Sequence, residues 1–394
     1  MTGKLKTDLR FAAREFYKTW TLLHLYPDTY RKLVKEKPVN EKKIVFLEVR
    51  MQELTDSFTS VYQTLEKSGE WELCSVFPSE GMTDRRSVRR RSLAAIEDLA
   101  DAHYIFVNDS SYLLGCLPLR KETRVIQLWH ACGAFKMFGY SLAGKKFGSE
   151  KRELDRYPMY RNFSCVTVSS PEVVWAYAQA FQLPEKRILP IGIPRTDVFF
   201  DPERRKAAKE KLQNCLSAGI GERRIVLYAP TFRGDVAHAS SPDALDFAEL
   251  HSLLGDKYLF LIKHHPFVKR PPKIPEKLSA FAVDVTSQMT IEELLMISDV
   301  CISDYSSLIF EYSLYERPMI FFAHDIREYG DWRGFYYPYE EMTPGPVVRT
   351  TREAAEELKK LEDGFDSGRV KAFREKFMSS CDGHATERVL RLLR

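Results

Sequence analysis

The chain has 394 residues, so its length favours two domains of roughly 150–200 residues each. The formal net charge is only +4 at pH 7, and its local basic clusters lack a base-reading or stacking motif, so no nucleic-acid partner is expected. The seven cysteines form no C-x-x-C pair, and there is no apolar run of about 18 residues, so neither a zinc site nor a membrane-spanning helix is indicated.

Residues 1–43 differ from the rest of the chain in composition. They contain 11 Lys or Arg and 5 Asp or Glu residues, interleaved with aromatic side chains such as Phe11, Phe16 and Trp20. This pattern is typical of an interfacial helix on an anionic membrane. It is equally typical of a helix that packs on the domain that follows, and the sequence leaves both interpretations open.

Strands and helices alternate through residues 44–200. We predict strands at Ile44–Val49, Leu73–Phe77, His103–Asn108, Arg124–Trp129, Cys165–Ser169 and Arg187–Ile191, and helices at Met51–Ser68 and Pro171–Phe181. Such alternation favours a parallel sheet. The pattern breaks at Gly192–Asp197, so we expect one domain over 44–200 and a second over 201–394.

Five arginines lie within eight residues in the first of these domains. They are Arg85, Arg86, Arg89, Arg90 and Arg91. A run of this kind is usually a solvated surface. Because Arg binds phosphate through two hydrogen bonds, it could also contact lipid phosphate or the membrane face.

A histidine follows the strand predicted at Arg124–Trp129. His130 precedes a turn of small residues that includes Gly133, and Lys136 lies beyond it. A histidine at this position is a candidate general base, and Gly133 and Lys136 are candidate contacts for the acceptor or a phosphate. An isolated histidine is more often buried in the core with its hydrogen bonds made by neighbouring groups.

The second half repeats the alternation of strands and helices. We predict strands at Arg224–Tyr228, Tyr258–Lys263, Ala282–Val285, Val300–Ser303 and Met319–Phe322, and helices at Phe247–Leu254, Ile291–Ile297 and Leu308–Tyr315. An aromatic and Gly/Pro-rich loop spans Trp332–Pro346, and three charged helical stretches follow Thr351.

The turn between Val300–Ser303 and Leu308–Tyr315 carries a group of polar residues. Ser306 is a predicted N-cap, and Asp304 and Ser307 flank it. Hydroxyl groups at a helix start suit a phosphate. Simple capping of the helix is an equally good explanation.

Polar groups therefore follow four predicted strands, at His130 and Lys136, at Thr231 and Arg233, at His265, and at Ser306 and Ser307. Ligands bind at the carboxyl ends of parallel strands, and two such domains facing one another form the GT-B architecture. These groups suit a diphosphate. No D-x-D pair is present, so we expect neither a metal nor another cofactor.

Five segments resemble the motif series of the CDP-glycerol glycerophosphotransferases, the teichoic-acid primases and polymerases. They are Gln127–Lys136, Tyr228–Arg233, His265–Pro266, Ser303–Glu311 and Pro344–Val348, in the order found in that family. Five ordered motifs are jointly specific where any one would be weak.

The resemblance implies a GT-B-like, α/β enzyme, peripheral on the cytoplasmic face of the membrane. It would move an alditol phosphate from CDP-glycerol or CDP-ribitol to an undecaprenyl-diphosphate-linked acceptor and release CMP. It implies that His130 is the general base and that His265 holds the pyrophosphate or assists the leaving group. Thr231, Arg233, Asp304, Ser306 and Ser307 would bind the donor phosphates, and Glu311 would face the ribose or the alditol.

The residues after His130 depart from the family's commoner Gly-Thr-Pro-Leu-Lys pattern, and they look more like those of primase-type and some ribitol-type members. Glu311 stands where many members have Asp. The chain also lacks the extra N-terminal domain of the long polymerases, which favours a primase or single-step transferase. Two alternatives remain: a glycosyltransferase that uses another nucleotide sugar, and a binding protein that has lost catalysis.

Overall fold

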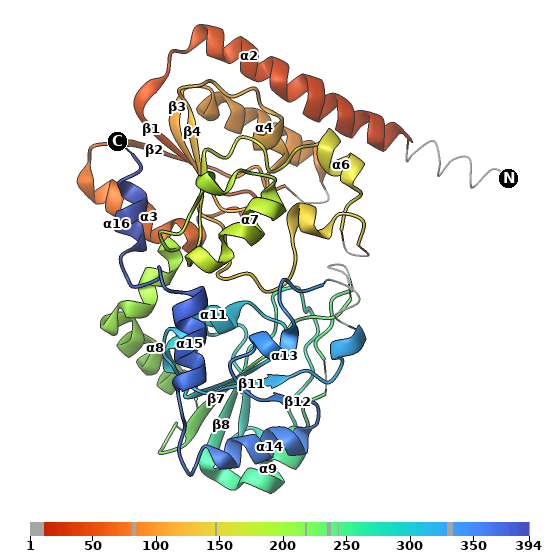
Figure 1. The fold of residues 1–394 in the computed structure, drawn as a ribbon, viewed down its shortest axis with the longest axis vertical. Coiled ribbons are helices and arrows are strands. Elements are labelled where there is room, and N and C mark those ends of the chain that lie inside the picture. Colours follow the sequence, from red (N-terminus) through yellow and green to blue (C-terminus); the bar gives the residue numbers. More distant parts are fainter. Residues whose placement is uncertain are drawn as a thin grey trace, which may run out of the picture.

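The computed structural model describes residues 12–80, 84–145, 148–216, 219–234, 238–242, 244–328 and 334–393. These residues form two six-stranded parallel sheets, one above the other in Figure 1. Each sheet is flanked by helices, so the predicted GT-B-like α/β class is confirmed. Trp332 and Arg333 of the predicted aromatic loop lie outside the described residues.

The first sheet has the strand order β2-β1-β3-β4-β5-β6. Its strands are β1 (Asn40–Leu47), β2 (Glu72–Val76), β3 (Ala102–Val107), β4 (Arg124–Gln127), β5 (Cys165–Thr167) and β6 (Ile188–Leu189). The chain adds β2 on one side of β1 and β3 on the other. The point where the strand order reverses therefore lies between β1 and β3.

The second sheet has the strand order β12-β11-β10-β7-β8-β9. Its strands are β7 (Arg224–Ala229), β8 (Tyr258–Ile262), β9 (Ala282–Asp284), β10 (Val300–Ser303), β11 (Met319–Phe322) and β12 (Val347–Val348). Here the strand order reverses between β7 and β10. Such a reversal opens a crevice at the carboxyl ends of the strands, where ligands of this class of sheet bind.

The helices of the first half are α2 (Tyr26–Glu36), α3 (Asp56–Ser68), α4 (Arg85–Leu99), α5 (Tyr112–Cys116), α6 (Lys151–Arg156) and α7 (Val174–Phe181). Those of the second half are α8 (Pro202–Cys215), α9 (Phe247–Leu254), α10 (Ile291–Ile297), α11 (Leu308–Ser313), α13 (Tyr339–Met342), α14 (Thr351–Lys360), α15 (Gly368–Phe377) and α16 (Ala385–Leu390). The largest core cluster contains buried residues of both halves.

Several elements have the predicted bounds, among them β10, β11, α9 and α10. The helix predicted over Met51–Ser68 is wrong in its first turn, because α3 begins at Asp56. The carboxylate of buried Glu48 accepts hydrogen bonds from the N–H of Arg50 (3.1 Å) and from the hydroxyl of Thr55 (2.7 Å). These bonds hold an irregular loop where a helical turn was expected.

The C-terminal helices connect the two halves. Phe373 of α15 stacks on Phe310 of α11, with ring centroids 5.2 Å apart. The last helix, α16, returns to the first domain and packs beside α3 (Figure 1). β1 begins at Asn40, before the predicted start of the first domain at residue 44; the other strands of the first sheet lie within 44–200 and those of the second within 201–394, whereas the final helix lies against the first domain.

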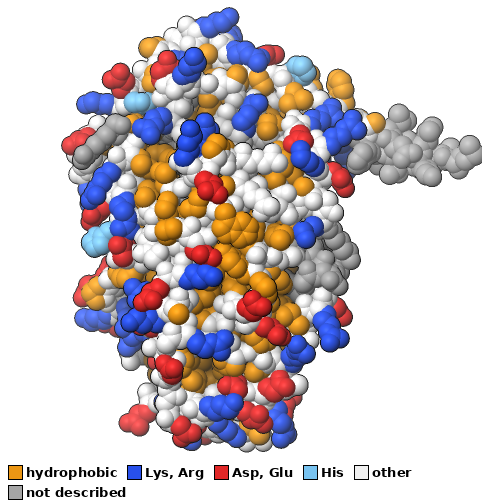
Figure 2. Space-filling view, in the orientation of Figure 1, with side chains coloured by type: hydrophobic (Ala, Val, Ile, Leu, Met, Phe, Trp, Pro, Cys, Tyr) orange, Lys and Arg blue, Asp and Glu red, His pale blue; other side chains and the backbone are white. Residues whose placement is uncertain are grey.

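The N-terminal segment is helical from residue 12 to Glu36, with a π-helical turn at Thr21–Leu25. It buries Leu22, Tyr26 and Tyr30 against α4 and α5, so it docks on the first domain. Phe16 and Trp20 stay exposed, at 74% and 41%. Figure 2 shows Lys and Arg side chains gathered near the start of this helix. No described helix is long and apolar enough to cross a membrane.

Candidate active site

His130 lies on a strained turn after β4. The preceding residue, Trp129, has a φ of 59°, a left-handed conformation that costs a bulky residue about 1–3 kcal/mol. The N–H of Trp129 donates to the side-chain oxygen of Gln127 over 2.8 Å, and the Trp129 and His130 rings stack at 4.4 Å. The turn leaves the imidazole of His130 exposed at the sheet edge.

One ring nitrogen of His130 is already engaged. Nδ1 lies 2.9 Å from the backbone oxygen of Asn108, which follows β3. A carbonyl oxygen can only accept, so Nδ1 carries the proton and Nε2 of the neutral ring keeps its lone pair. The side chain of Asn108 donates to Glu48, after β1, over 2.6 Å. His130 is thus anchored where β1 and β3 diverge.

A carboxylate lies beside this histidine. Asp109 forms an ion pair with Arg50. Burial alone would raise the pKa of Asp109, but the charges of His130 and Arg50 together hold it below its usual range. Asp109 therefore keeps its negative charge close to the His130 turn.

Arg195, in the turn Pro194–Phe200 between the domains, contacts both of them. It donates to the backbone oxygen of His130 over 2.6 Å and to Glu292 over 2.7 Å. It also lies 3.9 Å from the carboxylate of Glu311, a residue of α11 that is 3% exposed. Burial raises the pKa of Glu311. Arg195 therefore ties the His130 turn to two acidic side chains of the second domain.

A second network lies where β7 and β10 diverge. Asp304 accepts hydrogen bonds from the N–H (2.9 Å) and the hydroxyl (3.0 Å) of Thr231. Arg233 donates to Asp304 over 3.0 Å and to Asp325 over 2.6 Å. Burial alone would raise the pKa of Asp325, but hydrogen bonding and charge from Arg233 hold it below its usual range. Most hydrogen-bonding capacity of Thr231 and Asp304 is therefore used within the network.

Ser306 and Ser307 connect this network to Glu311 along the chain. Both are half-buried, and the hydroxyl oxygen of Ser306 accepts a long hydrogen bond of 3.4 Å from the N–H of Leu308. α11 begins at Leu308 as predicted, but the residue at the cap position is Ser307 and not the predicted Ser306.

His265 follows β8, and its ring centroid lies 4.7 Å from that of Phe232. Phe232 stands between Thr231 and Arg233 in sequence. The predicted donor residues of the second domain therefore gather at its carboxyl edge.

Gly133 and Lys136 lie where the two domains meet. The N–H of Gly133 donates to the hydroxyl of Ser169 over 3.0 Å, and a Cβ at Gly133 would be 2.2 Å from the ring of Phe310. These contacts favour a packing role for Gly133 over the predicted phosphate contact. Lys136 pairs through its backbone with Phe335 of the aromatic loop.

The arginine-rich run begins α4, which follows the carboxyl end of β2. It therefore starts at the same edge of the first sheet as His130. Exposed members of the run are Arg85, Arg86 and Arg90. The guanidinium of Arg89 lies 5.4 Å from the ring of Tyr17 on the N-terminal helix.

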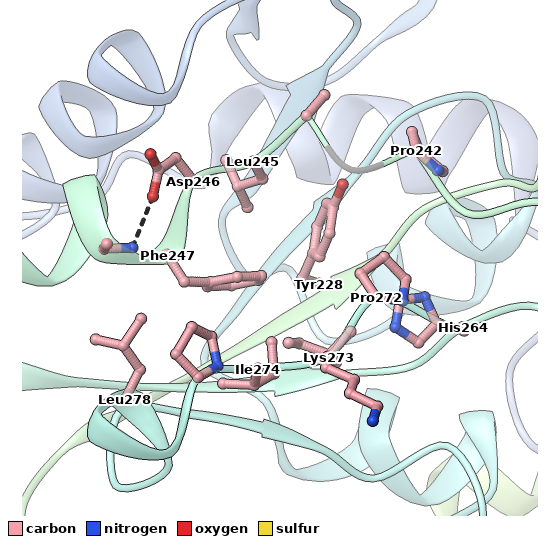
Figure 3. Close-up of a pocket in the computed structure, with 14 residues that line it drawn as sticks. Tyr228, Pro242, Leu245, Asp246, Phe247, His264, Pro272, Lys273, Ile274 and Leu278 are labelled. Carbon is pink, nitrogen blue, oxygen red and sulfur yellow. Dashed lines mark hydrogen bonds between the residues drawn. The ribbon is translucent and has the colours of Figure 1, made fainter. Parts of the chain in front are cut away.

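A pocket of about 340 Å³ lies beside the second domain's carboxyl edge (Figure 3). Tyr228, Phe247 and His264 line it, and Nδ1 of His264 is 2.8 Å from the hydroxyl of Ser241. The pocket contains none of the predicted site residues, although His264 directly precedes His265. It therefore does not by itself identify the donor site.

Sequence reasoning missed Glu48, Asn108, Arg195 and Asp325. Asn108 was the last residue of a predicted strand, and Arg195 lies in the break at Gly192–Asp197, so both positions carried a signal. No sequence pattern indicated which residues they contact. Among the described residues, no group of three or more His, Cys, Asp or Glu side chains could hold a metal ion.

The two domains each contain a parallel sheet, and each sheet carries polar residues where its strand order reverses. This combination defines a GT-B-like transferase. The chain belongs to the CDP-glycerol:poly(glycerophosphate) glycerophosphotransferase family, whose model matches residues 29–394. The family predicted from the motif series is thereby confirmed.

Two curated relatives come from Bacillus spizizenii. The chain is 35% identical to a teichoic acid ribitol-phosphate primase over 93% of this chain and 94% of the relative. It is 36% identical to a teichoic acid poly(ribitol-phosphate) polymerase over 94% of this chain but only 58% of the relative.

A solved structure is similar throughout. It is the wall teichoic acid polymerase TagF, in a histidine-to-asparagine variant soaked with CDPG. Its TM-score is 0.77 at 25% identity, and the match covers 100% of this chain and 97% of the TagF chain.

Proposed function

We propose that the chain transfers ribitol phosphate, in preference to glycerol phosphate, from a CDP-alditol to a hydroxyl of an undecaprenyl-diphosphate-linked acceptor in wall teichoic acid synthesis, with release of CMP. The observation that carries the proposal is that Asn108, at the strand-order reversal of the first sheet, holds the His130 ring, while Arg195 contacts both the backbone oxygen of His130 and Glu311 of the helix that follows the Ser306–Ser307 turn. Two relatives with ribitol-phosphate in their names, at 35% and 36% identity, support the choice of alditol.

The reaction is attack by the acceptor hydroxyl on the phosphorus that carries the alditol. The acceptor oxygen forms a bond to this phosphorus while its bond to the CMP oxygen breaks. The hydroxyl proton moves to Nε2 of His130, whose Nδ1–H is held by Asn108. Positioning and charge stabilisation supply most of the acceleration in such displacements.

The donor diphosphate lies against the second domain in this proposal. The hydroxyls of Ser306 and Ser307 bind its oxygens, and His265 assists departure of CMP. The hydrogen bonds among Thr231, Arg233 and Asp304 fix the conformation of the loop after β7. They place the Arg233 guanidinium beside the phosphates.

Glu311 faces the ribose or the alditol, and Lys136 meets the acceptor side. Residues 44–200 form the acceptor side of the enzyme and residues 201–394 the donor side. Charge on the donor is compensated by protein groups without a metal.

The enzyme binds peripherally to the cytoplasmic face of the membrane. The exposed side chains Phe16 and Trp20 enter the interface, and the arginines at the start of α4 meet anionic headgroups. Sedimentation with anionic and neutral vesicles tests this part. Salt-sensitive binding to anionic vesicles is expected, and equal, salt-insensitive binding to both kinds would contradict it.

The transfer itself is tested with a donor panel. The purified chain is incubated with CDP-ribitol, CDP-glycerol and UDP-sugars, each with a short-chain lipid-linked disaccharide, and CMP, UMP and UDP are measured. Acceptor-dependent CMP release that is fastest with CDP-ribitol is expected. Release of UDP instead would establish the glycosyltransferase alternative, and faster turnover of CDP-glycerol would overturn the choice of ribitol.

A further inference from the structure

A cavity of about 330 Å³ lies between the N-terminal helix, α4 and α5. None of the residues given catalytic or donor roles line it. Its polar lining includes Tyr17, Lys18, Thr21, Arg85, Arg89 and Tyr112, and apolar side chains of all three helices complete the walls.

One wall of the cavity holds a polar group that the protein leaves unsatisfied. Thr21 is 6% exposed, and its hydroxyl has no hydrogen-bond partner within the described chain. A buried polar group without a partner lowers stability, and a valine would fill the same space without that loss. Thr21 also begins the π-helical turn Thr21–Leu25, a distortion that occurs frequently at functional sites.

The charged groups around the cavity favour an anion. Lys18, Arg85 and Arg89 contribute three cations. Lys18 is paired with Glu153 at 2.8 Å, and Glu80 is the acidic residue of the lining. The carboxylate of Glu80 already accepts from the N–H of Tyr112 at 2.8 Å and from two further donors at the start of α5. Among the described residues no carboxylate pairs with Arg85 or Arg89, and Arg89 contacts the ring of Tyr17 through its guanidinium face, so both arginines keep N–H groups for a ligand.

The cavity is close to the acceptor side of the site. Tyr112, in its wall, is four residues from Asn108, whose backbone oxygen holds His130. Four residues span at most about 14 Å. A group bound in the cavity could therefore belong to a molecule that also reaches His130.

An apolar surface adjoins the cavity. Tyr17 and Thr21 line the cavity. Phe16 and Trp20 lie on the neighbouring stripe of the same helix, and their side chains are exposed. A ligand with a phosphate head and a hydrocarbon tail would find both kinds of surface here.

We propose that this cavity binds the diphosphate of the lipid-linked acceptor, with the hydroxyl of Thr21 and the guanidinium of Arg89 as donors. The inference rests on the proposed function, because it supplies the position from which the acceptor's sugar hydroxyl extends to His130.

Calorimetry with farnesyl diphosphate tests this site without requiring transfer. The decisive variant is Thr21→Val, with Thr29→Val as its matched control on the same helix, since the hydroxyl of Thr29 bonds to Leu25 and does not line the cavity. Arg89→Ala is compared with Lys121→Ala, which removes the same charge from an exposed position outside the lining. Farnesol and inorganic pyrophosphate separate the contributions of tail and head.

Farnesyl diphosphate should bind the wild type and both controls alike. Affinity should fall about threefold to tenfold in Thr21→Val and tenfold or more in Arg89→Ala, as expected for one neutral and one charge-assisted hydrogen bond. Farnesol should bind more weakly than farnesyl diphosphate. Inorganic pyrophosphate that binds as tightly as farnesyl diphosphate would overturn the lipid part of the proposal. Equal affinity in Thr21→Val and Thr29→Val would overturn the site itself, whatever the outcome of the donor panel.

Transfer kinetics give a second readout. With CDP-ribitol saturating, Thr21→Val should raise the KM for a farnesyl-diphosphate-linked acceptor and leave kcat unchanged. An acceptor in which an alkyl ether replaces the diphosphate should show the same KM in both threonine variants. A Thr21→Val effect that is equal for the two acceptors would contradict the assignment of the diphosphate to this cavity.

Discussion

Gly133 allows a sharp test of how the two domains meet. Its φ is +62°, and an added Cβ would be 2.2 Å from the ring of Phe310. Gly69 has nearly the same φ, +64°, but nothing lies within 4 Å of the corresponding position. Alanine at either site therefore meets the same left-handed backbone, and only Gly133→Ala also meets an aromatic ring from the other domain.

The expected losses of stability follow from the left-handed backbone and from the contact with the Phe310 ring. The left-handed conformation costs alanine about 1–2 kcal/mol, and overpacking costs about 1–3 kcal/mol more. Gly69→Ala should thus lower the free energy of unfolding by about 1–2 kcal/mol and Gly133→Ala by about 2–5 kcal/mol. Urea denaturation followed by tryptophan fluorescence measures both variants. Phe310→Leu should recover part of the Gly133→Ala loss, because the contact is direct.

Equal losses in the two glycine variants would refute the reasoning. A different outcome is expected if Gly133 contacts a phosphate, as the sequence suggested. In that case the stability loss would not exceed that of Gly69→Ala, and the KM for the CDP-alditol would rise.

Three further predictions concern other contacts. Arg195→Lys keeps the charge but cannot bridge His130 and Glu292 as a guanidinium does. The kcat measured by CMP release should therefore fall about tenfold, while the CDP-ribitol Kd measured by calorimetry stays the same. An unchanged kcat would contradict this role of Arg195. The pKa of Asp325 is lower in the folded than in the unfolded chain, so its carboxylate stabilises the fold above the unfolded pKa of about 4, and this stabilisation is lost as pH falls through the folded pKa. The loss of unfolding free energy caused by Asp325→Asn should therefore shrink between pH 7 and pH 3 in denaturation experiments. A loss that stays constant over this range would be inconsistent with the Asp325–Arg233 pair. Of the seven cysteines, Cys215 is exposed, Cys74 is half-buried and the other five are buried, and burial raises the pKa of the Cys74 thiol to about 11. A maleimide should therefore label Cys215 first, and Cys215→Ser should remove this fast labelling; equally fast labelling of the Cys215→Ser variant would contradict the prediction.

The sequence was informative where a signal is local. The apolar run Tyr258–Ile262 is buried along its whole length, and it lies within the strand predicted at Tyr258–Lys263. Because such runs locate strand ends, they also located His130, Thr231 and the turn before α11.

Contacts between distant parts of the chain were not predictable in this way. Gly133 and Phe310 are far apart in sequence, and no local pattern indicates that they touch. The same holds for Arg195, whose partners come from both domains. The irregular loop before α3 depends on the buried carboxylate of Glu48, which removes a helical turn that periodicity favours.

The central claim is that His130 takes the proton of the acceptor hydroxyl. The most direct measurement compares CMP release by wild type and His130→Ala at saturating CDP-ribitol and acceptor, with the CDP-ribitol Kd measured in parallel. A loss of roughly 100-fold or more in kcat, with the Kd unchanged, is predicted for removal of a general base. A folded His130→Ala variant that releases CMP at nearly the wild-type rate would contradict the claim.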